Sequence, residues 1–339
     1  MQNRIDWADA FKGILIILVV LGHSIQSVCM QRGDDFMDNY LWNLIYSFHM
    51  PAFMAMSGFL AYRQNRQCID TFKDLASSIL RRFRQLIVPF LIWSVIMYVV
   101  NHNVEHIYDY VLYPNKSYWF LWALFFIVVV FCIGEYISSK LRFKQEVVIG
   151  CIAFILMGIK LVLPDSKLLG FEYVAYYFLY YVMAYYLHKF NRLIPVKSSY
   201  IYLLAILWFF LGSFYVAKGV PEIVCWISTI PGTVLNILYR ITTATIFILM
   251  MFGTAQKTTI GQSKFWKCIL EFGKISLGIY VVHMALRVWL VRGLDFIMPW
   301  CPEWILMTIT FVLLSIFSLW VVRFLSKWRF TAAWLLGKV

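Results

Sequence analysis

Long apolar runs recur along almost the whole chain, and short polar stretches separate them. A helix needs roughly 20 predominantly apolar residues to cross the hydrocarbon core of a bilayer. The pattern therefore predicts an all-α integral membrane protein with about ten transmembrane helices. The expected membrane segments are 11–31, 40–62, 86–101, 117–138, 146–163, 170–187, 199–216, 233–253, 275–291 and 304–324.

The same pattern indicates a single membrane domain over residues 1–339. No linker, low-complexity tract or internal repeat interrupts it, and we expect no appended soluble domain. The stretch 220–232 is apolar but contains two prolines, so we predict that it lies at the membrane interface. Segment 11–31 is too long for the apolar core of a signal peptide and lacks a small-residue cleavage site, so we expect it to remain as a signal anchor.

Composition supports the membrane assignment. Hydrophobic residues make up 62% of the chain and charged residues only 14%, whereas soluble domains are about 45–50% apolar and about 25% charged. A soluble protein of this composition could not cover its surface with polar side chains. A membrane protein exposes apolar side chains to lipid instead.

The net charge of +13 is distributed unevenly along the chain. With the N-terminus inside, cytoplasmic loops, tails and helix ends hold 22 of the 30 lysines and arginines, and the outer loops hold five. This asymmetry follows the positive-inside rule and predicts that both termini are cytoplasmic. The basic inner loops then face anionic membrane lipid, and we expect no nucleic-acid partner.

The seven cysteines show no paired spacing such as CxxC. Cys29, Cys225 and Cys301 fall near the predicted outer face, so one disulfide is compatible with the sequence. Neither a disulfide framework nor a metal site is predicted.

His23 is an ionisable residue inside the first predicted helix. It follows the cytoplasmic end by about 12 residues, or ~18 Å at ~1.5 Å per residue. Lys12 lies eleven residues earlier on nearly the same helix face, and Asp9 one turn before Lys12. Gly22 allows a neighbouring backbone or a substrate to approach closely. A buried histidine bonded to another helix is the structural alternative, and ionisable residues in membranes commonly mark functional sites.

His49 is expected at a similar depth in the adjacent second helix, ~14 Å from its outer end. Pro51 cannot donate to the carbonyl of Ser47, so we expect a kink there. Two histidines at one depth beside a kink favour a functional site over simple packing.

At the cytoplasmic end of the predicted third helix, Arg81 and Arg84 are three residues apart and share a helix face. Guanidinium groups bind phosphate bidentately. The positive-inside rule by itself also places arginines at the cytoplasmic end of a helix. Both a phosphate-binding role and a purely topological role therefore remain open for these two residues.

Five further positions beyond the third predicted helix carry polar or aromatic side chains of interest. Ser276, Tyr280 and His283 form one stripe, and such stripes usually face a bundle interior. Arg240 lies inside a helix and requires a partner, which we expect to be a carboxylate such as Glu172, a backbone carbonyl or an anionic substrate. Trp119 lies at the outer start of the fourth predicted helix. By default we interpret a tryptophan there as part of the aromatic belt at the membrane interface.

Taken in order, these motifs resemble the acyltransferase-3 family of membrane O-acyltransferases, and most closely its fucose-O-acetylase-like branch. The five motifs are Arg4-Ile-Asp-Trp-Ala-Asp9 running on through Lys12-Gly13 to Leu21-Gly22-His23, Phe48-His49-Met50-Pro51 with Ser57-Gly58-Phe59, Arg81-x-x-Arg84 with Pro89, Tyr118-Trp119-Phe120-Leu121, and Ser276-Leu-Gly-Ile-Tyr280-Val-Val-His283. Each is loose by itself, but the five cover both halves of the chain in the family's order. Many relatives carry arginine at the position of Lys12.

The resemblance implies transfer of an acyl group, usually acetyl, from cytoplasmic acyl-CoA to a hydroxyl. The acceptor is commonly a sugar of a surface glycan or its lipid-linked precursor, and the location implied is a bacterial inner membrane. By the same implication His23 is the catalytic histidine, and Arg81 and Arg84 act near the CoA side.

The residues and the resemblance together suggest a reaction path. The phosphates of CoA would dock on the basic inner face, with Lys12, Arg81 and Arg84 as candidate ligands, and the acyl arm would reach His23. Histidine is suited to activate an alcohol at neutral pH. His49, nearby amides or Arg240 could stabilise the oxyanion. Direct transfer and an acyl-histidine intermediate both fit.

A transporter, or a glycan or lipid flippase, is the competing class, since buried His and Arg also form proton relays and anion sites. Transporters often show repeats with broken helices in corresponding positions. Pro51 has no counterpart half a chain later, so we favour the enzyme.

Overall fold

The computed structural model describes residues 5–62, 69–101, 105–162, 167–190, 198–216, 232–255, 261 and 263–338. These residues are almost entirely helical, and no β-strand occurs among them. The predicted interfacial stretch 220–232 lies outside the described residues except for Gly232, and Cys225 also lies outside them.

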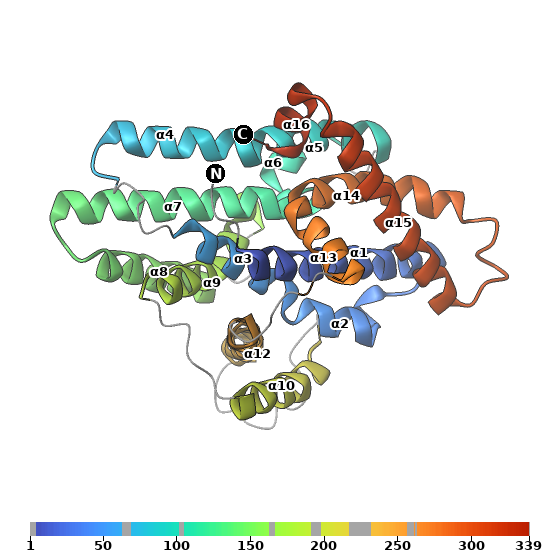
Figure 1. Cartoon of the computed structure of the whole chain (residues 1–339), viewed down its shortest axis with the longest axis horizontal. Helices are drawn as coiled ribbons and strands as arrows, with labels where there is room; N and C mark the ends of the chain where they lie inside the picture. The colour runs from blue at the N-terminus through green and yellow to red at the C-terminus, as the bar shows by residue number, and fades with distance from the viewer. Residues whose placement is uncertain are drawn as a thin grey trace. The chain divides into compact units, whose positions relative to one another are not determined.

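Figure 1 shows the described helices, coloured in their order along the chain. They are α1 (Asp6–Arg32), α2 (Tyr40–Tyr46), α3 (His49–Ala61), α4 (Phe72–Arg82), α5 (Val88–Asn101), α6 (Asp109–Leu112), α7 (Trp119–Leu141), α8 (Gln145–Val162), α9 (Phe171–Lys189), α10 (Ser198–Ser213), α12 (Gly232–Ala255), α13 (Lys264–Lys274), α14 (Ser276–Gly293), α15 (Glu303–Leu325) and α16 (Arg329–Leu336).

Each predicted membrane segment within the described residues coincides with a helix, but fewer than ten helices are long and apolar enough to span a bilayer. Seven described helices or helix pairs meet both requirements, and the bent pair α13–α14 makes eight. The helix α10 has 16 residues and is a shorter apolar helix. The helix α9 carries many tyrosines, whose hydroxyls lower its hydropathy.

The second predicted segment is broken where proline chemistry predicts a kink. It consists of α2 and α3, which are separated by Ser47 and Phe48. Pro51 has no N–H to donate to the carbonyl of Ser47 four residues earlier, so the helical ladder is interrupted there. The amide of Ala52 resumes the ladder by donating to the carbonyl of Phe48 at 2.9 Å.

The third segment begins well before the predicted residue 86. The helix α4 starts at Phe72, after Thr71 and Asp74 form a reciprocal capping box. This arrangement satisfies amide groups that a helix start leaves unpaired. The α4 helix is amphipathic, so the search for apolar runs missed it. A π-helix at Phe83–Ile87 joins α4 to α5.

The segment predicted over 275–291 is preceded by a helix that the apolar pattern did not indicate. The helices α13 and α14 meet at Ile275 and are bent by 79°. Polar residues interrupt α13, so its hydropathy is low although its inner face is buried through Ile269 and Phe272.

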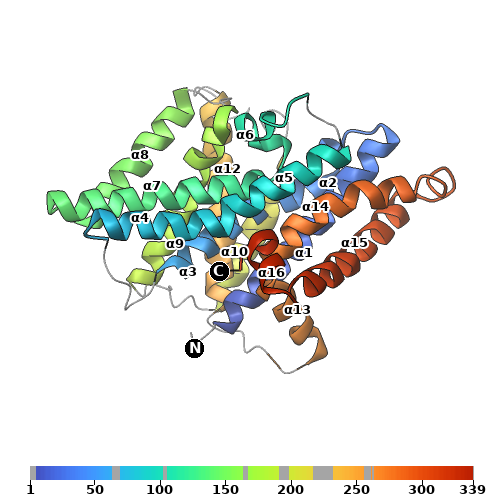
Figure 2. The ribbon, with the colours of Figure 1, turned by 90° about the horizontal axis from the view of Figure 1, so that it is seen from above.

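The chain divides into two compact units. The first contains residues 1–56 and 190–321, and the second contains residues 57–189 and 322–339. In the first unit α1 packs against α13, α14 and α2, and α10 lies beside α12 (Figures 1 and 2). In the second unit α7 packs against α4, α8 and α9, and α16 packs against α5 (Figure 2).

Glycines set the close packing of α1 on α13. A Cβ atom added at Gly273 would overlap the carbonyl oxygen of Asp9, and one added at Gly13 would overlap the carbonyl oxygen of Ile269. Small residues allow membrane helices to approach until their backbones touch. The first helix is therefore held tightly at its N-terminal end.

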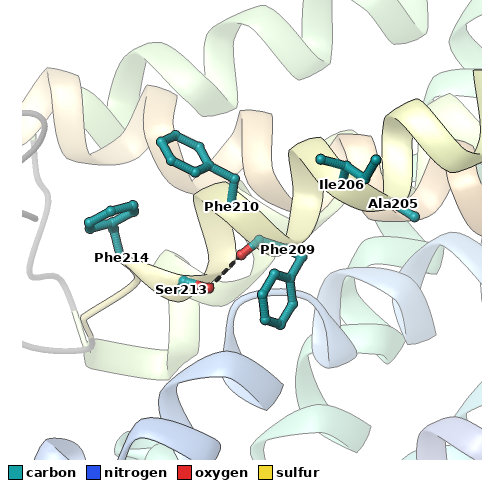
Figure 3. Close-up of a pocket in the computed structure, with 6 residues that line it drawn as sticks. All are labelled: Ala205, Ile206, Phe209, Phe210, Ser213 and Phe214. Atoms are coloured by element: carbon teal, nitrogen blue, oxygen red, sulfur yellow. Dashed lines mark hydrogen bonds between the residues drawn. The ribbon is translucent and has the colours of Figure 1, made fainter.

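The outer face of α10 is strongly apolar (Figure 3). A shallow hollow there is lined by Ala205, Ile206, Phe209, Phe210, Ser213 and Phe214. The hydroxyl of Ser213 donates to the carbonyl of Phe209 at 2.7 Å, so its polar group is satisfied within the helix. Such a face suits contact with lipid chains and offers no polar chemistry to a substrate.

Candidate functional site

The sequence-predicted histidines of the first unit converge. The helix α1 is continuous through Gly22 and His23, and α14 is continuous through Tyr280 and His283. Atom Nδ1 of His23 lies 2.8 Å from Nε2 of His283. The two rings are stacked, with centroids 5.0 Å apart and planes 22° from parallel. Two distant motifs of the sequence thus form one hydrogen-bonded pair.

His283 is held from its other side by its own helix. Its Nδ1 atom lies 2.8 Å from the carbonyl oxygen of Ile279, and its side chain is 0% exposed. The Tyr280 ring lies 5.9 Å from the His283 ring, centroid to centroid. Ser276, the first residue of the stripe, begins α14 directly after the bend at Ile275.

His49 begins α3 and is also buried, with 2% of its side chain exposed. Its Nδ1 atom lies 2.8 Å from the carbonyl oxygen of Ile45. The ring of Tyr46 packs edge-on against the His49 ring at 4.4 Å. Tyr46 also fills the space beside Gly22, where an added Cβ would lie 3.0 Å from the tyrosine ring. His49 interacts electrostatically with His23, so it belongs to the same site.

Arg287 is a site residue that the sequence analysis did not select. Its guanidinium interacts electrostatically with His23, His283 and Tyr46. It lies four residues after His283, on the stripe that already contained Tyr280 and His283. Extending that stripe by one turn would have found it. The site therefore contains a cation as well as three imidazoles.

Lys12 and Asp9 occupy the opposite end of α1. The Nζ atom of Lys12 lies 2.7 Å from a carboxylate oxygen of Asp9. Eleven residues separate Lys12 from His23, which is ~16 Å along the helix axis. The pair shares a helix face with the histidine but does not touch it.

Arg240 is bound by groups of its own unit. Its guanidinium donates to Asn236 at 3.0 Å, to the carbonyl of Val216 at 2.9 Å and to the hydroxyl of Tyr215. It also lies over the Tyr215 ring at 4.8 Å from the centroid. Of the partners expected from the sequence, the backbone carbonyl is present. Glu172 belongs to the second unit, where it pairs with Lys160 at 3.5 Å.

The two arginines of the RxxR element belong to the second unit. Both Arg81 and Arg84 are exposed, whereas Arg82 donates to Gln85 at 2.7 Å. The π-helix begins between the two arginines, at Phe83. Single π-helical turns occur frequently at functional sites. The exposed guanidinium groups are available to a phosphate-bearing ligand.

Trp119 also lies in the second unit and begins α7. Its indole packs on two tyrosines of α9, with centroids 4.5 Å from Tyr173 and 5.4 Å from Tyr177. The tryptophan is half-buried, so it contributes to packing within this unit.

The cysteines near the predicted outer face and the possible metal ligands bear on two further sequence expectations. Cys29 and Cys301 are both free thiols, and Cys29 donates to Glu303 at 3.3 Å. Among the described residues, no group of three or more His, Cys, Asp or Glu side chains is arranged to hold a metal ion.

Comparison with known proteins connects this geometry to a chemistry. A family model described as "Acyltransferase domain" matches residues 5–324. This range includes the helices α1, α3 and α14, which carry His23, His49 and His283, and also the two arginines Arg81 and Arg84. No solved structure matches the chain.

Two curated proteins are similar to parts of the chain. Nodulation protein NolL of Sinorhizobium fredii is 32% identical over 160 residues, which cover 44% of this chain and 42% of the relative. Nodulation protein NolL of Mesorhizobium japonicum is 32% identical over 139 residues, which cover 37% of this chain and 34% of the relative. The chain thus spans less than half the length of either relative.

Proposed function

This chain belongs to the acyltransferase domain family, and we propose that it is a membrane O-acyltransferase. In this proposal it moves an acetyl group from cytoplasmic acyl-CoA to a hydroxyl of a cell-surface or lipid-linked glycan. The observation that supports it best is the pairing of the half-buried His23 with the fully buried His283, with a 2.8 Å hydrogen bond between the rings. An imidazole is the side chain best suited to take a proton from an alcohol at neutral pH.

The proposed roles follow from what each group can do chemically. His23 acts as the base, or as the group that is itself acylated. The buried His49 accepts a hydrogen bond from the substrate, and Arg287 offers positive charge to the oxyanion that forms from the thioester. Arg81, Arg84 and Lys12 bind the phosphates of CoA in this proposal. Asp9 orients Lys12 through their ion pair.

The remaining site residues support the substrate path. In this proposal Arg240, Ser276 and Tyr280 support substrate binding from within the first unit, and Trp119 does so from within the second. In this proposal the enzyme lies in a bacterial inner membrane and has both termini in the cytoplasm. The resemblance to the fucose-O-acetylase-like branch makes a fucosylated oligosaccharide the first glycan acceptor to assay.

Ligand binding provides a first test that separates an enzyme from a transporter or flippase of glycan or lipid. Acetyl-CoA should raise the melting temperature of the purified full chain, because a ligand at about 100 times its Kd stabilises the folded state by about 2.7 kcal/mol. ATP at the same concentration is the control for nonspecific polyanion binding. No shift with acetyl-CoA, or an equal shift with ATP, would contradict the proposal.

Transfer itself is the second test. The purified protein in nanodiscs should release CoA thiol from acetyl-CoA when a fucosylated oligosaccharide is added, and mass spectrometry should find the acetyl group on the sugar. His23→Ala should abolish both signals, whereas His106→Ala, at an exposed histidine, should leave them unchanged. Near-normal acetylation by a folded His23→Ala variant would remove the catalytic assignment. Mass spectrometry of surface glycan from a strain lacking the protein identifies the natural acceptor.

The same preparation separates the two routes of transfer. An acetylated enzyme that accumulates without acceptor and is lost in His23→Ala supports the acyl-histidine route. Absence of that species in a single turnover supports direct transfer.

A further inference from the structure

The hydrogen bonds of His283 determine which of its nitrogens carries the proton. Its Nδ1 atom lies 2.8 Å from the carbonyl oxygen of Ile279. A carbonyl oxygen only accepts, so Nδ1 must be the donor. The ring is 0% exposed, and an isolated charge in such a place is costly. A neutral ring with Nδ1 protonated leaves Nε2 as an acceptor.

This acceptor faces His23. Its partner at 2.8 Å is Nδ1 of His23, which must therefore donate. A neutral imidazole has a single N–H, so Nε2 of His23 is left with its lone pair. The carbonyl of Ile279 thus determines the tautomer of His283, and His283 determines that of His23.

We propose that His283 is a positioning residue that holds His23 in the Nδ1–H tautomer and presents its Nε2 atom as the reactive base. The catalytic meaning of this arrangement rests on the proposed O-acyltransferase function, whereas the tautomer follows from the hydrogen bonds and from the burial of His283. In the proposed site His283 orients His23 much as a carboxylate orients the histidine of a catalytic triad. It does so as a neutral group, which suits a membrane interior where an unpaired carboxylate would be costly.

The proton balance of direct transfer follows from this arrangement. Nε2 of His23 takes the proton of the acceptor hydroxyl as its oxygen bonds to the thioester carbonyl carbon. The carbon–sulfur bond then breaks, and the Nε2 proton passes to the departing thiolate. While His23 carries both protons, its Nδ1–H bond to His283 is charge-assisted and therefore stronger. The acyl-histidine route requires the same lone pair on Nε2 as nucleophile.

His49 provides an internal reference within the same unit. Its Nδ1 atom is also 2.8 Å from a carbonyl oxygen, that of Ile45. The same reasoning assigns it the Nδ1–H tautomer, but through its own helix and independently of His283. A change at His283 should therefore alter His23 and spare His49.

Nitrogen-15 NMR of histidine-labelled full chain in lipid bilayers tests the tautomers directly. In the unsubstituted protein, His23 and His49 should both show a protonated Nδ1 and an unprotonated Nε2, with assignments made from the loss of signals in His23→Gln and His49→Gln. In His283→Met, which keeps side-chain length but has no strong acceptor, His23 should shift toward the Nε2–H form while His49 keeps its signal. An Nε2–H signal from His23 in the unsubstituted protein would overturn the proposal. So would an unchanged His23 signal in His283→Met.

Activity measurements then separate orientation from structural support. His283→Gln places an amide oxygen that can accept from Nδ1 of His23, and it should retain activity within about threefold. His283→Met should lower kcat by about tenfold to a hundredfold without changing the KM for acetyl-CoA, since general-base catalysis contributes about 10²- to 10⁴-fold. Equal loss in the two variants, with folding intact, would assign His283 a packing role.

The NMR measurement and the activity measurement can contradict the tautomer assignment and the proposed function separately. If the tautomers are as expected but no acyl group is transferred to any alcohol, the hydrogen-bond relay holds and the proposed O-acyltransferase function is wrong. If acyl transfer occurs and His23 is in the other tautomer, the function holds and the relay is wrong. If His283→Met does not fold, the tautomer of the unsubstituted protein and the His283→Gln variant still decide the proposal.

Discussion

Atom Nδ1 of His23 and atom Nε2 of His283 are 2.8 Å apart, although 260 residues separate them along the chain. Packing of α1 against α14 brings them together. The carbonyl of Ile279 anchors the second ring. This contact joins the first and last motifs of the sequence into one site and gives the half-buried histidine of α1 a defined hydrogen-bond partner.

Arg287 should matter for the chemical step. Its guanidinium interacts electrostatically with His23 and His283, so its positive charge acts where we propose that the oxyanion forms. Loss of one oxyanion-stabilising donor typically lowers kcat by about 10²- to 10³-fold. We expect Arg287→Met to show a loss of that order in acetyl transfer and Arg287→Lys to recover part of it.

The control for this prediction is Arg292→Gln, since Arg292 is exposed at the end of the same helix. It should retain the kcat of the unsubstituted protein. An Arg287→Met variant with normal kcat would remove this residue from the proposed mechanism.

The RxxR element should act on the donor rather than on the acceptor. Arg84→Ala should raise the KM for acetyl-CoA several-fold more than the KM for a fucosylated oligosaccharide, because a phosphate contact is lost. Steady-state kinetics with each substrate varied in turn measures both constants. Lys73→Ala removes an exposed cation from α4, the helix that precedes Arg84, and it should change neither KM. Equal effects of Arg84→Ala on both substrates would indicate a topological anchor.

The contact between α1 and α13 should be sensitive to a single methyl group. Gly273→Ala places a Cβ against the carbonyl oxygen of Asp9, and such overpacking costs about 1–3 kcal/mol. We expect a lower melting temperature in a thermal unfolding assay. Gly150→Ala is the matched control, because nothing lies within 4 Å of an added Cβ there. It should be neutral or stabilising by up to about 1 kcal/mol. The prediction is wrong if both variants melt alike.

The positive-inside distribution predicts opposite accessibility for two exposed positions. Asp34→Cys should react with a membrane-impermeant maleimide in intact cells, because residue 34 follows the outer end of α1 in the predicted topology. Lys144→Cys should react only after the membrane is opened, because it lies in a predicted cytoplasmic loop. Both side chains are exposed, so accessibility from one side decides the comparison. The labelling is done in a variant without other reactive cysteines. The reverse pattern would invert the topology.

Local sequence patterns were sufficient to predict a helical membrane protein and to locate most of its long helices. Apolar runs are a local property, so they locate helices such as α1, α7 and α15 without knowledge of their neighbours. Proline chemistry is local as well, and it predicted the interruption beside Pro51. Amphipathic helices carry a weaker signal in a search for apolar runs, which explains why that search missed α4 and α13.

Tertiary structure decided the partners of the buried polar groups. No pattern along the chain states that His23 meets His283, that Arg287 joins them, or that Arg240 is bound by Tyr215 and the carbonyl of Val216. Such contacts depend on how helices far apart in sequence pack and on which faces they turn toward one another. The sequence therefore indicated that the histidine of α1 lies within a membrane helix, and only the packing of α1 on α14 decided which residue it contacts.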